Sequence, residues 1–247
     1  MVRRTKADAE VTRHSLLDAA ELLFQARGVS RTSLNDIALA AGTTRGAIYW
    51  HFKDKADLFN AMMERTTLPL EQDLACVGDH AHELEDPLMA LRLSMLSVLH
   101  KTATDPQLRR VFEVATLQVE YNDEMRAVRE RHLRVRNECM ARTAQGLEAA
   151  AQRLAQPLPM PLRNAALGLH VMFDGLLQNW LLDPSAFDLE ACGEHTLNAY
   201  LRGLGFNVND APAPSPLAAM QLKAGAGAKP PEPSSLPTPA RSRKQTA

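Results

Sequence analysis

The stretch RTSLNDIALAAGTTRGAIYWHFKDKADL, residues 31–58, concentrates aromatic rings and cations in a short part of the chain. Three of the twelve aromatic residues fall within four positions of it: Tyr49, Trp50 and Phe52. Basic side chains are interleaved with these rings, from Arg45 to Lys55. What this mixture can bind depends on the local structure that the flanking residues predict.

The same stretch predicts two short helices joined by a glycine turn. Ser33 followed by Asp36 has the spacing of a capping box, and Gly42 ends the helix that begins there. Thr44 is an N-cap residue for a second helix, which runs through RGAIYWHF. Residues 33–51 therefore have the size and punctuation of a helix-turn-helix. Such a unit lays its second helix in the major groove of DNA, with the first turn at the base edges.

In this interpretation the second helix and its flanks supply the DNA contacts. Arg45 can reach guanine or phosphate, and Gly46 lets the backbone approach closely. Lys55, near the start of the next helix, adds a positive charge that faces the DNA backbone. Ile48 and Phe52 instead fill the small core. Further phosphate or base contacts are expected from Thr44, Tyr49, Trp50 and His51.

Spacing alone leaves an alternative open, an amphipathic helical hairpin whose rings are simply core. The charge distribution favours DNA binding modestly. The whole chain of 247 residues has a net charge of −1. Residues 1–55 carry nine Lys and Arg against six Asp and Glu, a local net charge of +3. Any attraction to nucleic acid is therefore local to this end of the chain.

The stretch resembles the signature of the TetR family of bacterial transcriptional repressors. That motif runs T-[TS]-x-x-x-I-A-x-x-A-G, then T/S-x-G-x-x-Y, x-H-F and a K three residues later. The matching residues are Thr32, Ser33, Ile37, Ala38, Ala41, Gly42, Thr44, Gly46, Tyr49, His51, Phe52 and Lys55. Thr43 departs from the motif, because relatives usually carry an apolar residue there. The resemblance adds Thr32 and Ser33 to the DNA-binding positions. The N-terminal sequence is also similar to that of the AcrR-like branch of the family, whose members are repressors of multidrug efflux pumps.

The rest of the chain predicts an all-α fold of about nine helices, because helical periodicity is widespread and strand patterns are nearly absent. Residues 1–55 are the three-helix helix-turn-helix DNA-binding domain, and 56–206 form a helical ligand-binding and dimerisation domain, as the resemblance implies. Residues 207–247 hold eight of the fifteen prolines and few large apolar groups, which predicts a disordered Pro/Ala-rich tail.

Ligand-binding residues are expected in the second domain. His170 and Asp174 lie one turn apart on an apolar helix, where a buried carboxylate is costly unless it is paired or used. An internal pair or a helix-end salt bridge is the alternative to a polar anchor in a drug pocket. The resemblance favours the pocket, because AcrR-like repressors line it from this helix and Phe173 and Asp174 match those positions. The same alignment suggests Thr67, Val98, Phe112 and Cys139.

A homodimer is expected through the last two helices, which family members pair into a four-helix bundle. The side of one helix that carries Leu176 and Trp180, with Leu197 and Tyr200 from the next, is the expected interface. For Trp180 the alternative is a position in the core of its own chain.

Several other function classes lack a sequence signal. There is no phosphate-binding Gly loop, nucleophile elbow, H-E-x-x-H or paired Cys motif, so we expect neither an enzyme nor a cofactor. His80 and His82 stand among acids, where an exposed loop is a better interpretation than a metal site. Three widely spaced cysteines and a charged N-terminus predict a cytoplasmic protein, and no apolar run is long enough to span a membrane.

Together these features predict a dimeric repressor that leaves a palindromic operator when it binds a small hydrophobic inducer. The resemblance makes a multidrug efflux operon the expected target and antibiotics or similar compounds the expected inducers. It also suggests that Leu58, Met62 and their helix carry the movement from pocket to DNA. The alternative within the family is a regulator of another pathway, such as lipid or secondary metabolism.

Overall fold

The computed structural model describes residues 6–155 and 157–208, and every regular element in those ranges is a helix. Their bounds are α1 (Lys6–Arg27), α2 (Leu34–Ala40), α3 (Arg45–His51), α4 (Lys55–Asp79), α5 (Pro87–Thr104), α6 (Pro106–Leu117), the short 3-10 helix η1 (Asp123–Met125), α7 (Arg126–Arg153), α8 (Leu162–Leu182) and α9 (Leu189–Gly203). The prediction of an all-α fold with about nine helices is confirmed for this part of the chain. Of the predicted tail, residues 209–247 lie outside the described residues.

Side-chain caps begin α2, α4 and α5. The Ser33 hydroxyl accepts a hydrogen bond from the Asp36 N–H, and the Asp36 carboxylate accepts one from the Ser33 N–H at 3.0 Å, which completes the capping box of α2. Asp54 accepts from the Asp57 N–H at 2.8 Å and begins α4. Asp86 does the same for α5, with Pro87 in its first turn. These caps satisfy backbone donors that a helix start leaves free.

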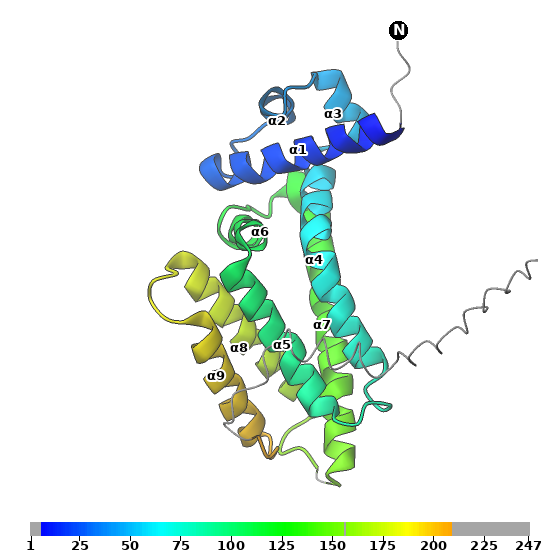
Figure 1. Ribbon diagram of the computed structural model, residues 1–247, viewed down its shortest axis with the longest axis vertical. Coiled ribbons are helices and arrows are strands. Elements are labelled where there is room, and N and C mark those ends of the chain that lie inside the picture. The colour runs from blue at the N-terminus through cyan, green and yellow to red at the C-terminus, as the bar shows by residue number, and fades with distance from the viewer. Residues whose placement is uncertain (1–5, 156, 209–247) are drawn as a thin grey trace, which may run out of the picture. The chain divides into compact units, whose positions relative to one another are not determined.

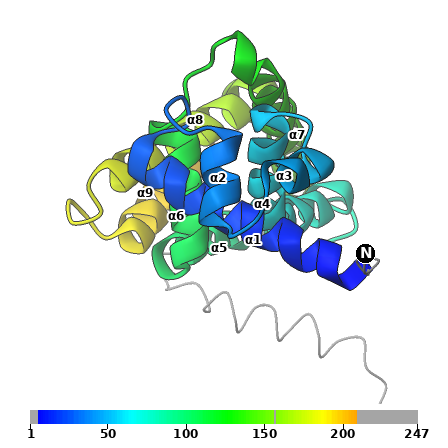
Figure 2. The same cartoon turned by 90° about the horizontal axis from the view of Figure 1, so that it is seen from above.

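Helices α1, α2 and α3 lie together at one end of the described unit, and α4 and α7 run lengthwise away from them (Figures 1 and 2). The boundary predicted between residues 55 and 56 falls at the first residues of α4, which continues to Asp79 with Pro69 inside it. The two halves therefore share one uninterrupted helix. The division into two domains stays a prediction.

The core of the N-terminal half continues into the other half. Phe24, Ile48 and Phe52 are buried in one cluster with Val114 of α6 and Met125 of η1. Burying each large apolar side chain contributes about 1.5 to 3 kcal/mol. Because residues beyond α4 contribute to this cluster, the N-terminal half is packed, through α1 and α4, onto α6 and the start of α7.

A buried polar cluster holds α9 against α5. The Arg92 side chain is 3% exposed, and its Nε donates to the Asn198 Oδ1 at 2.8 Å. Its Nη2 also pairs with the Glu194 carboxylate. A buried guanidinium needs such partners, so this cluster fixes α9 on the ligand-binding half.

Candidate DNA interface and ligand-binding half

The helix-turn-helix has the turn that its sequence predicts. Gly42 adopts a φ of 65°, a left-handed conformation that side chains other than glycine rarely take. The Thr44 hydroxyl then accepts from the Ala47 N–H at 3.2 Å and caps α3. On the inner side, the Ile48 side chain is fully buried and Phe52 is 2% exposed. These contacts hold α3 at the surface in a fixed orientation.

The opposite face of α3 is exposed and carries most of the predicted DNA-binding residues. Trp50 is 73% exposed and Tyr49 is 49% exposed, although large aromatic side chains are usually more buried than this. The Arg45 guanidinium lies 5.7 Å from the centre of the Tyr49 ring. The Trp50 and His51 rings meet edge to face at 4.6 Å, with His51 half-buried. Thr44, Arg45, Gly46 and Ser33 are also exposed, so a DNA duplex can reach this face.

Two predicted DNA-binding residues instead point into the domain. Thr32 is 1% exposed, and its hydroxyl donates to the Gly28 carbonyl at 2.8 Å. The Lys55 Nζ donates to the Val29 and Thr32 carbonyls, each at 3.2 Å, and lies 3.3 Å from the Glu124 carboxylate. The expectation that the Lys55 charge faces DNA therefore does not describe the free chain. The Lys55 side chain points inward because it donates to carbonyl oxygens of the loop before α2. This contact joins residues far apart in the chain, and spacing in the sequence does not show it.

A polar hollow of about 390 Å³ opens beside the DNA-reading face. Its basic side chains are Arg31, Lys53 and Lys55, and Tyr49 contributes its ring. Its full lining is Ser30, Arg31, Thr32, Ser33, Leu34, Tyr49, Lys53, Asp54, Lys55 and Glu124. Hydrogen bonds from the Ser33 hydroxyl and N–H lower the pKa of the nearby Asp36 carboxyl. Exposed Arg31 and Lys53 could contact phosphates here.

The predicted ligand-binding residues come from five helices: Thr67 on α4, Val98 on α5, Phe112 on α6, Cys139 on α7, and His170, Phe173 and Asp174 on α8. Most are half-buried, whereas Thr67 is buried and Asp174 is exposed. The Thr67 hydroxyl contacts the Glu71 carboxylate at 2.6 Å, and the Arg131 Nη2 lies 2.9 Å from the same Glu71 oxygen. Burial, then the negative charge of Glu71, raises the pKa of the Cys139 thiol. The sequence gives no sign of the Glu71 contact, because Glu71 on α4 meets Arg131 on α7, 60 residues further along the chain.

His170 and Asp174 differ in their environments. Burial lowers the pKa of the His170 imidazole, and the Asp174 charge opposes this shift. Burial also raises the pKa of the Tyr121 hydroxyl, with a further contribution from Asp174. Because Asp174 is exposed, the cost of burying its charge does not apply in a single chain. The charge of Asp174 nonetheless contributes to the electrostatic environment of both His170 and Tyr121.

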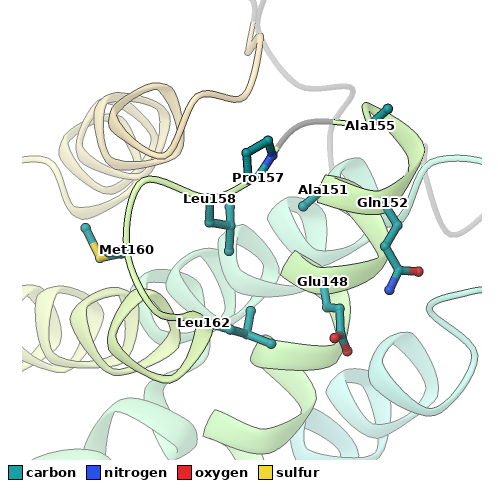
Figure 3. A pocket seen from close by; sticks show the side chains of 8 residues that line it. All are labelled: Glu148, Ala151, Gln152, Ala155, Pro157, Leu158, Met160 and Leu162. Carbon is teal, nitrogen blue, oxygen red and sulfur yellow. The ribbon is translucent and has the colours of Figure 1, made fainter.

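An open groove of about 420 Å³ lies elsewhere, between the end of α7 and the start of α8 (Figure 3). Leu158, Met160 and Leu162 give it an apolar wall, and Glu148 and Gln152 lie on its α7 side. The remaining lining residues are Ala151, Ala155 and Pro157. None of the predicted ligand-binding residues lines this groove.

The residues predicted for the dimer interface are largely internal. Trp180 is 6% exposed, with the Arg109 guanidinium 4.8 Å from its ring centre, and Leu197 is 1% exposed. This placement supports the alternative considered for Trp180, a position in the core of its own chain. Leu176 and Tyr200 are half-buried, and the Tyr200 hydroxyl donates to the Ala165 carbonyl at 2.8 Å. The large apolar side chains that α8 exposes are Leu167, Val171 and Leu182.

Among the described residues, no three His, Cys, Asp or Glu side chains are grouped as metal ligands. His80 pairs instead with Glu83, at 3.2 Å. No helix in the described part of the chain is long and apolar enough to cross a membrane.

A capped helix-turn-helix that exposes an arginine and two rings defines this chain as a DNA-binding regulator. Residues 16–62 match the bacterial regulatory proteins of the tetR family, and residues 86–206 match the C-terminal region of MAATS-type transcriptional repressors. The chain belongs to the TetR family, as its motif predicts, and is a DNA-binding repressor and not an enzyme.

Three similar proteins are informative. The HTH-type transcriptional regulator AcrR of Shigella flexneri is 38% identical over 195 residues, which cover 77% of this chain and 87% of that protein. The crystal structure of NalD, the secondary repressor of the MexAB-OprM multidrug efflux pump in Pseudomonas aeruginosa, has 37% identity and a TM-score of 0.73, covering 83% of this chain and all of that one. The complex of triclosan with SmeT, the repressor of the Stenotrophomonas maltophilia pump SmeDEF, has 32% identity and a TM-score of 0.70, covering 81% and 93%.

Proposed function

We propose that this protein is a dimeric repressor of a multidrug efflux operon that leaves its operator when it binds a small hydrophobic ligand. The observation that carries the proposal is the exposed face of α3, where Arg45, Tyr49 and Trp50 are accessible to DNA on a helix that is held in place. Similarity to NalD and SmeT, both described as repressors of multidrug efflux pumps, supports the choice of operon. The site of action would be the cytoplasm, where operator DNA is found.

In the DNA complex, each α3 would enter a major groove of a palindromic site. Two recognition helices of a dimer bind half-sites about one helical turn apart, roughly 34–36 Å. Arg45 in the first turn would reach a guanine edge or a phosphate. Ser33, Thr44, Tyr49, Trp50 and His51 would contribute the further phosphate or base contacts. Thr32 and Lys55, which are buried, would act by shaping the loop before α2.

The dimer would form through the exposed stripe of α8 together with α9. Leu167 and Val171 are 44% and 58% exposed and lie one turn apart, and an apolar pair of this kind gains free energy when a second chain covers it. Leu176 and Tyr200, which are half-buried, would lie at the edge of this contact. Trp180 and Leu197 would support it from inside the chain.

Ligand binding would act through residues of the second half, most of which are half-buried, whereas Asp174 is exposed. Val98, Phe112 and Phe173 offer apolar contacts, and His170 and Asp174 would orient polar groups of the ligand. A ligand that binds better to a conformation with displaced recognition helices shifts the population away from DNA. The complex of SmeT with triclosan supports a small, largely apolar inducer for this chain.

The test is a fluorescence anisotropy titration of the protein against the duplex upstream of its own gene, with and without triclosan. The proposal expects tight, sequence-specific binding that triclosan or another hydrophobic antibiotic weakens. The double variant Arg45→Ala/Tyr49→Ala should lose specific binding. Specific binding that no such compound affects would contradict the drug-responsive part, and a target operon of lipid or secondary metabolism would favour the alternative within the family.

A further inference from the structure

A polar seam joins α1 of the DNA-binding half to α6 of the ligand-binding half. Helix α6 lies beneath α1 (Figure 1), and the contacts along the seam are hydrogen bonds and ion pairs. They recur at one-turn intervals on α1, at Glu21, Gln25 and then Val29 just beyond its end. This regular spacing means that the same face of α1 meets α6 along its last two turns.

Glu21 is the centre of the seam. It is 1% exposed and belongs to α1, yet its carboxylate is held by two other helices. From α4, the Arg65 Nη2 pairs with Oε1. From α6, the Gln107 Nε2 donates to Oε1 at 3.0 Å, and the Arg110 Nη1 lies 3.6 Å from Oε2. Because an unpaired buried carboxylate is strongly unfavourable, separating α6 from α1 removes partners that Glu21 needs.

Two further links extend the seam toward the helix-turn-helix. The Gln25 Nε2 donates to the Glu113 carboxylate at 2.8 Å, and its Oε1 accepts from the Arg110 Nε at 3.2 Å. Beyond α1, the Val29 N–H donates to the carbonyl of Gln118, the C-cap of α6, at 3.2 Å. The loop that contains Val29 leads into α2. A displacement of α6 therefore acts on the backbone immediately before the helix-turn-helix.

We propose that Glu21 is a positioning residue, which makes α6 and α1 move together and so sets the orientation of the recognition helix for DNA. This inference rests on the DNA binding proposed above and adds a route through α6 and α1 to the route through Leu58 and Met62 of α4. Glu21 touches no DNA. It acts through α1 and the backbone of the loop at Val29.

The matched pair Glu21→Gln and Asp18→Asn separates this role from a general effect of charge. Both changes remove one negative charge from α1, and both residues pair with Arg65, Asp18 at 2.8 Å. The Asp18 side chain is 63% exposed, and no α6 contact to it is seen among the described residues. Gln107→Ala is the second test variant. It removes an exposed α6 side chain that touches Glu21 and leaves the Glu21–Arg65 pair intact, so it carries little risk to folding.

The readouts are operator affinity by anisotropy over a range of salt concentrations, and hydrogen exchange of α6 with and without the operator duplex. Allosteric coupling typically spans about 5- to 150-fold in affinity, and we expect Glu21→Gln to weaken operator binding by about tenfold. The salt dependence should not change, because no phosphate contact is lost. In the wild type, operator binding should slow exchange in α6, since linkage is reciprocal. Both Glu21→Gln and Gln107→Ala should reduce this protection, whereas Asp18→Asn should behave as the wild type.

The proposal would be overturned if both test variants bound the operator with wild-type affinity. It would also be overturned if the operator did not change the rate of hydrogen exchange in α6 of the wild type. A fall in affinity that Asp18→Asn shares would also overturn it, because the effect would then be one of charge alone. If the wild-type protein binds no duplex specifically, the proposed function fails, and the positioning role fails with it. That result differs visibly from the others, in which the wild type binds.

Discussion

Replacing Gly46 by alanine should raise the stability of the protein and lower its affinity for DNA. A Cβ at this position would meet nothing closer than the Thr44 Oγ1, at 3.9 Å, so the free chain has room for it. Alanine in a helix is favoured over glycine by about 0.5 to 1 kcal/mol. For a chain of this length such a gain raises Tm by about 2 °C. If the DNA backbone approaches Gly46 closely, the added methyl group must displace it.

The assay pairs a thermal melt with operator titration by anisotropy. We expect Tm to rise slightly and operator affinity to fall by about tenfold, a loss of roughly 1.4 kcal/mol. Gly203→Ala at the end of α9 is the matched control, because a Cβ there has room too, with nothing closer than 4 Å, and the site lies on another helix. Its operator affinity should equal that of the wild type. Unchanged affinity in Gly46→Ala would refute the close approach of DNA to this turn of α3.

Other variants test the Lys55 contacts, the dimer interface on α8 and the protonation of His170. Lys55→Met removes the ammonium donor from the Val29 and Thr32 carbonyls, of which the Val29 carbonyl keeps the Thr32 N–H at 3.3 Å. Urea unfolding should therefore show a loss of about 1 to 3 kcal/mol, while the salt slope of DNA binding stays the same. A slope smaller by about one unit would show that Lys55 contacts phosphate after all. Val171 is 58% exposed, so Val171→Asp should give monomers by light scattering and change the free energy of unfolding of the monomer by less than about 0.5 kcal/mol. Trp180→Ala should instead lower the free energy of unfolding by about 3 to 5 kcal/mol, because the Trp180 ring is buried in its own chain. A Val171→Asp variant that is still a dimer would contradict the α8 interface. Burial holds the pKa of the His170 imidazole below its usual range, so the unfolded chain binds a proton at this residue more readily than the folded chain. The stability that this residue contributes above about pH 6.5 should therefore be lost as the pH falls below that value. Between about pH 7.5 and about pH 5.5 the Tm of His170→Gln should fall less than that of the wild type.

The features that sequence reasoning predicted correctly are local. The capping box of Ser33 and Asp36, the turn at Gly42 and the cap at Thr44 lie within three or four residues of their partners, and the structure shows each of them. The inward positions of Ile48 and Phe52 also follow from helical periodicity and are confirmed. Local patterns therefore identify the helices and the DNA-reading face, since helix caps and helical faces depend on neighbours in the sequence.

The features that sequence reasoning missed depend on distant partners. Lys55 turns inward because it meets the Val29 carbonyl, 26 residues earlier in the chain, and Glu124, from a segment beyond α6. Trp180 is covered by Arg109, and Glu21 is held from α6. A single sequence does not show which polar residues of two distant helices meet. The seam between α1 and α6 could therefore be found only from the folded chain.

Selection of duplexes from a random pool, with the wild-type protein and with Arg45→Ala, shows whether the exposed face of α3 reads a palindromic operator. The wild type should enrich an inverted repeat whose half-sites lie about 10 base pairs apart, centre to centre. Arg45→Ala should lose the preference for guanine at one position of each half-site. A pool with no enriched sequence would show that the protein does not recognise a specific operator. The same sequence enriched equally by both proteins would show that Arg45 on α3 does not read it.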